Sequence, residues 1–151
     1  MTIQLNKDQT GLIMALAKFY AGPEQYFVLS GQAGVGKTTC MRYFAEQLKS
    51  EYPGIKICMS APTNRACAVL KDAVNDDDLT FKTIHSILGL RMMANGEIKE
   101  LKDSGEDKIT DFDLIVVDEG SMVSTILLDY IKKKTALADT KIIFIGDKAQ
   151  L

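Results

Sequence analysis

The 151-residue sequence lacks a hydrophobic run long enough to cross a membrane. Its longest apolar segments, Leu114–Val117 and residues 142–145, have the length of β-strands, whereas a transmembrane helix needs about 20 apolar residues. The N-terminus has neither a basic start nor an apolar stretch behind it, so it does not match a signal peptide. These absences predict a protein without a membrane partner.

Cysteine and histidine are also scarce. The sequence has three cysteines, Cys40, Cys58 and Cys67, and a single histidine, His85. They lie too far apart and in the wrong combination for a zinc site, and an odd number of cysteines in apolar segments does not suggest a disulfide framework. A reducing, cytoplasmic setting fits this usage best.

The chain carries no excess of positive charge. Its net charge is -2, with a pI near 5.4, so a nucleic-acid site must rest on local geometry instead of a general basic field. Hydrophobic residues make up 46% and charged residues 25%, which is ordinary for a globular protein and excludes disordered and low-complexity classes. The length suits one domain.

Apolar periodicity and Gly or Pro breaks predict alternating helices and strands. We expect a first helix after Asn6, with Gln9 in a capping box, that ends at Gly22. The further expected helices span about 37–49, 63–74 and 124–137, the strands 26–30, 55–60, 114–117 and 141–145, and residues 80–88 combine a short strand with a helical turn. This order predicts an α/β protein with a parallel sheet covered on both faces.

A small insertion interrupts this alternation at about residues 90–111. Asn95-Gly96 lies between two short apolar segments, 90–93 and 98–101, and Asn-Gly in such a setting is a strong hairpin signal. The charged stretch 102–108 that follows is typical of a solvated loop. We therefore expect a β-hairpin that projects from the main sheet.

Residues 31–38 match the phosphate-loop pattern G-x-x-x-x-G-K-[ST] at every fixed position. An apolar strand precedes the loop and a helix pattern follows it, so backbone N–H groups and the helix N-terminus would point at phosphate oxygens. Lys37 would contact the β- and γ-phosphates, and Thr38 would offer a hydroxyl to Mg²⁺. The alternative is a glycine-rich turn with an exposed lysine. The predicted nucleotide-binding residues are Gly31, Ala33, Gly34, Val35, Gly36, Lys37, Thr38 and Thr39.

Two acids, Asp118 and Glu119, directly follow the apolar strand Leu114–Val117. In a parallel α/β sheet the carboxyl ends of the strands meet at the ligand-binding edge, which is also where the phosphate loop lies. We expect Asp118 to bind Mg²⁺ and Glu119 to act as the general base for the attacking water. The alternative is an acidic pair that caps the next helix. Gln150, in the segment after the last strand, would reach the same edge, although the residues by themselves favour an ordinary glycine turn for that segment.

Six blocks in order resemble the N-terminal RecA-like motor domain of superfamily 1 DNA helicases of the RecD and phage Dda type. They are Leu5-Asn6-Lys7-Asp8-Gln9, the phosphate loop 31–39, residues 60–66, Thr83-Ile84-His85-Ser86, residues 117–122 with the acidic pair, and Gly146–Leu151. The resemblance implies a RecA-like P-loop NTPase fold, ATP with Mg²⁺ as cofactors and single-stranded DNA as partner. It also implies that Gln9 contacts adenine and that Gln150 couples the γ-phosphate to DNA. The DNA contacts it implies are Pro62, Thr63, Asn64, Thr83 and His85.

Each of these residues also has a simpler structural interpretation. Thr63 can merely cap a helix, His85 can be a structural histidine, and Gln9 can serve only in the capping box. The sequence departs from the family at Gly120, where alanine is usual and where we expect the change to leave the acids alone, and at Lys148, where proline is common. No aromatic residue lies at the tip of the expected hairpin, where this group carries a strand-separating pin.

The resemblance implies an ATP-dependent DNA helicase or ATPase, acting as a monomer with replication or recombination proteins in a bacterial or phage-infected cell. The sequence ends at Leu151, within the last of the matching blocks, so we expect the second RecA-like domain to be absent and residues 1–151 to be domain 1A. Such a chain should bind ATP without unwinding a duplex. The alternatives are another P-loop NTPase or kinase, although a guanine-specific N-K-x-D is missing, and a non-catalytic nucleotide- or DNA-binding module.

Overall fold

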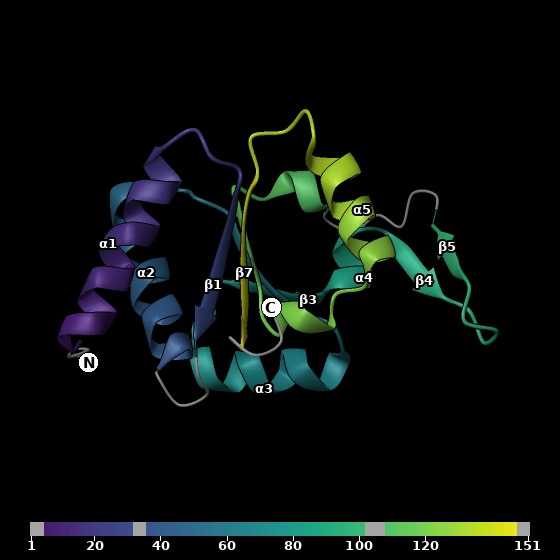
Figure 1. Ribbon diagram of the computed structural model, residues 1–151, viewed down its shortest axis with the longest axis horizontal. Coiled ribbons are helices and arrows are strands. Elements are labelled where there is room, and N and C mark those ends of the chain that lie inside the picture. Colours follow the sequence, from purple (N-terminus) through teal and green to yellow (C-terminus); the bar gives the residue numbers. More distant parts are fainter. Residues whose placement is uncertain (1–4, 32–35, 102–107, 148–151) are drawn as a thin grey trace.

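A five-stranded parallel sheet forms the centre of the protein in a computed structural model, which describes residues 5–31, 36–101 and 108–147. The strand order is β1-β7-β6-β2-β3, and the paired strands β1 and β7 lie side by side at the centre of Figure 1. The strands span Tyr26–Gly31 (β1), Ile57–Ala61 (β2), Thr80–Thr83 (β3), Leu114–Val117 (β6) and Lys141–Asp147 (β7). All four pairings are parallel. The predicted α/β fold is confirmed, and the boundaries of individual elements shift by a few residues, as for β2, which begins two residues later than expected.

The register of the strands brings their carboxyl ends together at one edge. Gly31 pairs with Asp147, Ser60 pairs with Val117, and Ala61 pairs with Thr83. The segments that follow these strands carry the phosphate loop, the acidic pair and the two proposed DNA-contacting blocks. All the blocks that the resemblance picks out, except the one at the start of the first helix, therefore lead off the same edge, as expected for a ligand site in this architecture.

Three helices cover one face of the sheet: α1 (Lys7–Ala21), α2 (Lys37–Glu51) and α3 (Asn64–Val74). Side chains such as Leu16, Phe44 and Leu70 pack with the inward residues of the strands in one buried cluster. Local signals explain where two of these helices start. The predicted capping box forms at α1, where Asn6 and Gln9 exchange hydrogen bonds of 2.8 and 3.0 Å, and Thr63 Oγ1 accepts from Ala66 N at 3.1 Å to cap α3.

The opposite face is covered by α5 (Thr125–Thr135), the short helix α4 (Ile84–Ile87), and the 3₁₀ turns η1 (Ile109–Asp111) and η2 (Gly120–Met122). Ser124 caps α5, which ends two residues earlier than the sequence pattern indicates. The predicted hairpin is present beside this layer as β4 (Leu90–Met92) paired antiparallel with β5 (Ile98–Glu100). Lys134 of α5 contacts Glu100 of β5 at 2.6 Å and ties the hairpin to the domain.

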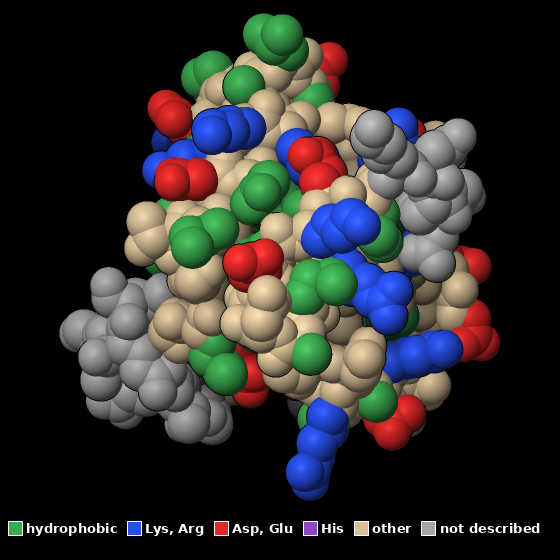
Figure 2. Space-filling view, turned by 90° about the vertical axis from the view of Figure 1, so that its right-hand side faces the viewer, with side chains coloured by type: hydrophobic (Ala, Val, Ile, Leu, Met, Phe, Trp, Pro, Cys, Tyr) green, Lys and Arg blue, Asp and Glu red, His purple; other side chains and the backbone are tan. Residues whose placement is uncertain are grey.

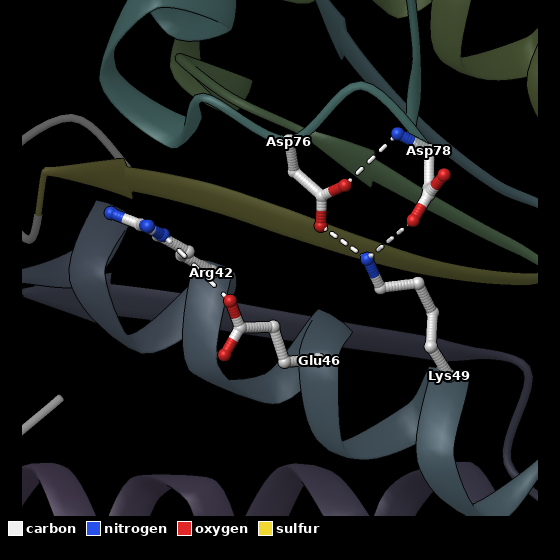
Figure 3. A network of polar contacts seen from close by, with 5 residues as sticks. All are labelled: Arg42, Glu46, Lys49, Asp76 and Asp78. Carbon is white, nitrogen blue, oxygen red and sulfur yellow. Dashed lines mark hydrogen bonds and ion pairs between the residues drawn. The ribbon is translucent and has the colours of Figure 1, made fainter. Parts of the chain in front are cut away.

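An ionic cluster holds the far end of α2 against the turn between α3 and β3 (Figure 3). Lys49 Nζ lies 2.5 Å from Asp76 Oδ2 and 3.4 Å from Asp78 Oδ2. Although partial burial alone lowers the pKa of Lys49, its hydrogen bonds and charge interactions with the two aspartates raise it above the ordinary value of 10.5. The cluster lies at the amino ends of the strands, away from the edge described above.

Charge is evenly mixed on the face that carries the hairpin. Figure 2 shows Lys and Arg side chains interspersed with Asp and Glu on that side, with apolar groups scattered between them. Within the described ranges, no helix is both long and apolar enough to span a membrane. Both observations agree with the composition, so recognition on this face must depend on individual residues.

Candidate nucleotide and nucleic-acid site

The phosphate loop joins β1 to α2, as the motif requires. Gly31 ends the strand and Gly36 is the N-cap of α2, with a φ of +77° that glycine adopts without strain. Gln32, Ala33, Gly34 and Val35 lie outside the described residues. The helix that begins at Lys37 therefore directs its N-terminus toward the loop, which is the arrangement that binds phosphate.

Gln9 lies directly against the end of this loop. Its Oε1 accepts from Asn6 N in the capping box, and its Nε2 occupies the space that a Cβ on Gly36 would take. The simple interpretation of Gln9 as a cap is thus correct but incomplete, because the cap also fixes the side chain beside the phosphate loop. Glycine is favoured at position 36 by its left-handed backbone conformation, and a Cβ there would also displace the Gln9 amide.

Lys37, Thr38 and Thr39 form the first turn of α2. Lys37 Nζ donates to the carbonyl oxygen of Gly146 in β7 at 3.3 Å, which places the ammonium group between β1 and β7 at the carboxyl edge. Lys37 and Thr38 are half-buried and Thr39 is exposed. The roles of Lys37 and Thr38 toward phosphate and Mg²⁺ stay predictions, and both side chains lie at the edge where those roles place them.

The acidic pair leaves the end of β6 at the same edge. Asp118 is half-buried, its N donates to Ser60 O at 2.8 Å, and its Oδ1 accepts from Glu119 N at 3.0 Å. Glu119 is exposed and has a φ of +54°, an uncommon conformation for a residue other than glycine. Ser124 supplies the cap of α5, so the alternative in which the acids cap that helix does not hold.

Gly120 lets the acidic turn pack directly onto β7. A Cβ at this position would lie 3.3 Å from Ile145 O and 3.4 Å from Phe144 Cβ, which is closer than side chains usually approach. Glycine in place of the family's usual alanine therefore allows the acidic turn to lie closer to β7. Gln150, beyond the end of β7, lies outside the described residues.

Thr38, Asp118 and Glu119 line one pocket of about 310 Å³ with the side of α3, here called the acid pocket. Its full described lining is Thr38, Thr63, Arg65, Ala66, Val69, Leu70, Ala73, Asp118 and Glu119. This volume is at the lower end of the roughly 300–1,000 Å³ of small-molecule sites.

A hydroxyl and carboxylates are the oxygen donors that Mg²⁺ prefers, usually with phosphate oxygens completing the shell. No cluster of three or more His, Cys, Asp or Glu residues that could hold a metal exists in the described ranges. The hydroxyl of Thr38 and the carboxylates of Asp118 and Glu119 are donors that fit a metal held jointly with a nucleotide.

A second depression of about 600 Å³, here called the hairpin groove, runs between the start of α3, α4 and the hairpin. It brings together all five predicted DNA contacts, and its described lining is Pro62, Thr63, Asn64, Thr83, His85, Ser86, Gly89, Leu90, Arg91, Met92 and Leu101. His85 Nε2 is buried and has no hydrogen-bond partner among the described residues, which does not favour the interpretation of His85 as a fully satisfied structural histidine. Thr63 lines both the groove and the acid pocket.

Sequence reasoning missed two arginines that the fold adds to these depressions. Arg65 lines the acid pocket and Arg91 lines the hairpin groove. The placement of Arg91 depends on how the hairpin docks, which no local pattern shows. The sequence did offer one clue to a role for Arg65: it is a cation in the first turn of a helix, where the helix dipole disfavours positive charge.

Comparison with known proteins places these features in a family. A family profile described as an AAA domain matches residues 4–151. The chain is 31% identical over 140 residues to the RecBCD enzyme subunit RecD of Buchnera aphidicola, covering 83% of this chain and 22% of that protein. It is 32% identical over 140 residues to the uncharacterized protein R530 of Acanthamoeba polyphaga mimivirus, covering 83% of this chain and 28% of that protein. The chain thus spans about a quarter of the length of these relatives.

Solved structures show the same fold at low sequence identity. The Pif1 helicase of Candida albicans superimposes with a TM-score of 0.62 at 19% identity, covering 97% of this chain and 33% of that protein. The UvsW helicase of bacteriophage T4 gives a TM-score of 0.65 at 12% identity, covering 95% and 53%. The chain belongs to the AAA domain family, and the match to RecD confirms the predicted resemblance to the motor domain of RecD-like superfamily 1 helicases.

Proposed function

We propose that this chain is the ATP-binding and ATP-hydrolysing motor domain of an ATP-dependent DNA helicase that moves along single-stranded DNA. The observation that carries the proposal is the shared wall between the acid pocket and the hairpin groove. Thr63 lines both, so a nucleotide and a nucleic-acid strand would bind on either side of one residue. A motor needs such proximity because each ligand must influence the other.

In the nucleotide site, the loop backbone and Lys37 would hold the phosphates, and Gln9 would contact the base from its place beside Gly36. Thr38 and Asp118 would hold Mg²⁺, which draws negative charge away from the β- and γ-phosphates. Glu119, exposed in the acid pocket, would take the proton of the attacking water. Gln150 remains a proposed link between the γ-phosphate and DNA.

In the hairpin groove, DNA would contact hydroxyl, amide and imidazole groups instead of a dense basic surface. Pro62, Thr63, Asn64, Thr83 and His85 line it together, and His85 Nε2, which has no partner in the described part of the chain, is suited to a phosphate or base. The start of α3 adds backbone N–H groups that suit a DNA phosphate. This arrangement is compatible with the acidic balance of the chain.

This chain covers 22% of the RecD relative, which is therefore more than four times longer than the matched segment. Helicases of this type supply an arginine from a second RecA-like domain, and such arginines accelerate hydrolysis by orders of magnitude. We therefore expect the 151-residue chain to bind ATP, to hydrolyse it slowly and not to unwind a duplex by itself. Robust unwinding by the purified chain would contradict this expectation.

We further propose that the domain acts as a monomer beside replication or recombination proteins in the cytoplasm of a bacterial or phage-infected cell. The RecD relative supports the proposal of protein partners, since its name makes it a subunit of the RecBCD enzyme. Burial raises the pKa of the Cys40 and Cys67 thiols, which keeps them protonated and unreactive, as suits a reducing compartment. Native mass spectrometry and pull-downs would test these assignments.

The deciding experiment measures binding of a fluorescent ATP analogue and ATP turnover, with and without single-stranded DNA. We expect Lys37→Ala to weaken nucleotide binding by at least about tenfold, which corresponds to a lost charged hydrogen bond. Glu119→Gln should keep binding within about twofold and lower turnover about 10²- to 10⁴-fold. Equal binding by the wild type and Lys37→Ala would refute the proposal.

Two further readouts distinguish the alternatives. If GTP or nucleoside monophosphates compete as well as ATP does, a different P-loop enzyme or a kinase is indicated. If the wild type binds nucleotide but turns over no faster than Lys37→Ala, the chain is a non-catalytic binding module. Stimulation of turnover by single-stranded DNA would favour the motor.

A further inference from the structure

Arg65 is an exposed arginine in the acid pocket to which neither the family resemblance nor the proposed mechanism assigns a task. It lines the pocket together with Thr38, Asp118 and Glu119, and it is the only cation among the described lining residues. Its side chain makes no ion pair or hydrogen bond within the described part of the chain. An arginine that shares a pocket with two acids and pairs with neither remains available to a ligand.

The stability of α3 does not account for a cation at this position. Arg65 is the second residue of the helix, and no acidic residue in the first turn balances its charge. A positive charge near a helix N-terminus is unfavourable, because the free N–H groups already carry partial positive charge. A bound anion would reverse that balance, since it would interact favourably with both the guanidinium and the helix terminus.

We propose that Arg65 binds the terminal phosphate of the nucleotide from the α3 side of the acid pocket. The inference rests on the proposed function, and it names a cation on this chain's own domain that lines the same pocket as Thr38 and Glu119. The planar guanidinium suits this task, because it donates two parallel hydrogen bonds to one phosphate group. The loop and Lys37 would hold the rest of the phosphate chain, so Arg65 distinguishes a triphosphate from a diphosphate.

The place of Arg65 on α3 gives this contact a second consequence. Thr63 caps the same helix turn and also lines the hairpin groove, and Asn64 lies between the two residues. Farther along α3, Leu70 and Val74 are buried in the core, so the helix responds as one body. A contact between Arg65 and the terminal phosphate would therefore act through α3 and change the affinity of the hairpin groove for DNA. By thermodynamic reciprocity, DNA bound in the groove would change the affinity for the triphosphate by the same factor.

The test compares equilibrium binding of ADP and of ATPγS, a slowly hydrolysed triphosphate, to the 151-residue chain in the presence of Mg²⁺. We expect the wild type to prefer ATPγS. Arg65→Gln should weaken ATPγS by about tenfold, as for the loss of a charged hydrogen bond, and leave ADP within about twofold. Arg65→Lys should recover part of the preference, because it keeps the charge and loses the bidentate geometry.

The matched control is Lys71→Gln, which removes the same charge from an exposed position near the other end of α3. It should leave both nucleotide affinities unchanged. The coupling is measured by titrating an oligothymidine strand in the presence of ADP or ATPγS. For the wild type and for Lys71→Gln, the affinity for the oligothymidine strand should differ between ADP and ATPγS. For Arg65→Gln, the strand affinity should be the same with either nucleotide. Because Arg65 is exposed, thermal unfolding should confirm that the variant is folded.

The outcomes separate the inference from the function on which it rests. If the wild type shows no Lys37-dependent nucleotide binding, the proposed function itself fails, and the inference fails with it. If the wild type binds but Arg65→Gln keeps the preference for ATPγS, only the inference is overturned. A variant that loses ADP and ATPγS equally, or that loses only strand affinity, also contradicts a contact with the terminal phosphate.

Discussion

Polar groups at the two ends of the parallel sheet differ in how many hydrogen-bond partners they have. At the amino end, partly buried polar groups have several partners each: Gln25 Nε2 lies within hydrogen-bond distance of the carbonyl oxygens of Thr135, Ala138 and Thr140, and Lys141 Nζ donates to those of Phe19, Gly22 and Glu24. These bonds close the C-terminal ends of α5 and α1 against the sheet. Burial lowers the pKa of Lys141, yet its ammonium group has three acceptors.

At the carboxyl end, several polar groups are left without partners. Ser60 Oγ and His85 Nε2 are buried and make no hydrogen bond in the described ranges, and Arg65 makes none either. Glu119 adopts an unfavourable backbone conformation at the same edge. Unpaired polar atoms and local strain cost stability, and they are typically retained where a ligand uses them. The contrast indicates that the amino end stabilises the fold and that the carboxyl end is arranged for binding.

The largest expected effect is at Lys141. Lys141→Met should lower the free energy of unfolding by about 1–3 kcal/mol, because three carbonyl groups at and just after the end of α1 lose a charged donor and the Phe19 ring loses the ammonium group that lies 4.9 Å from its centroid. Urea denaturation measures this difference. Nucleotide affinity should stay within about twofold. A variant with wild-type stability would remove the basis for assigning stabilisation to the amino end.

A smaller effect is expected from the ionic cluster of Figure 3. Lys49→Met should cost about 1 kcal/mol at neutral pH, the upper end for a partly exposed pair. Because the pKa of Lys49 is raised in the folded protein, the charge stabilises the fold fully below about 10.5, its unfolded value, and less as pH rises through the folded value. Unfolding curves of the wild type and the variant should therefore converge only above pH 10.5. Convergence between pH 7 and pH 9 would contradict this assignment.

The smallest effects come from a matched pair of buried hydroxyls. Thr140 Oγ1, at the amino end, donates to Phe112 O at 2.8 Å, whereas Ser60 Oγ, at the carboxyl end, has no partner in the described structure. Thr140→Val should cost about 1 kcal/mol, and Ser60→Ala should be neutral within about 0.5 kcal/mol or slightly stabilising. Thermal unfolding of both variants compares them directly. Equal losses at the two positions would show that the two ends do not differ.

Much of the fold followed from the sequence because its signals are local. The capping box at Asn6 and Gln9, the cap at Thr63 and the hairpin at Asn95-Gly96 each depend on a few neighbouring residues, and all three are present. The continuous apolar run of β6 predicted a strand buried on both faces, and all four of its residues are buried. Boundaries were less accurate, as at the end of α5, because the last helical turn depends on what the chain packs against.

The candidate site was only partly predictable for the same reason. The phosphate loop and the acidic pair are recognised from adjacent residues, but nothing in the sequence shows that Thr63 lines two depressions or that the amide of Gln9 lies against Gly36. Those contacts join segments far apart in the chain. Their prediction would require knowing the strand order and the docking of each helix beforehand.

The sequence by itself determined the elements, the chemical groups and the edge of the sheet that carries them. Hydrophobic period, caps and glycine positions are properties of short segments, and the carboxyl edge follows from parallel pairing. Only the tertiary structure decided which groups line the same depression, such as Arg65 with the acids in the acid pocket and the hairpin with the start of α3 in the hairpin groove. The reason is physical: a side chain's type is written locally, but its neighbours are set by the packing of segments that are distant in the chain.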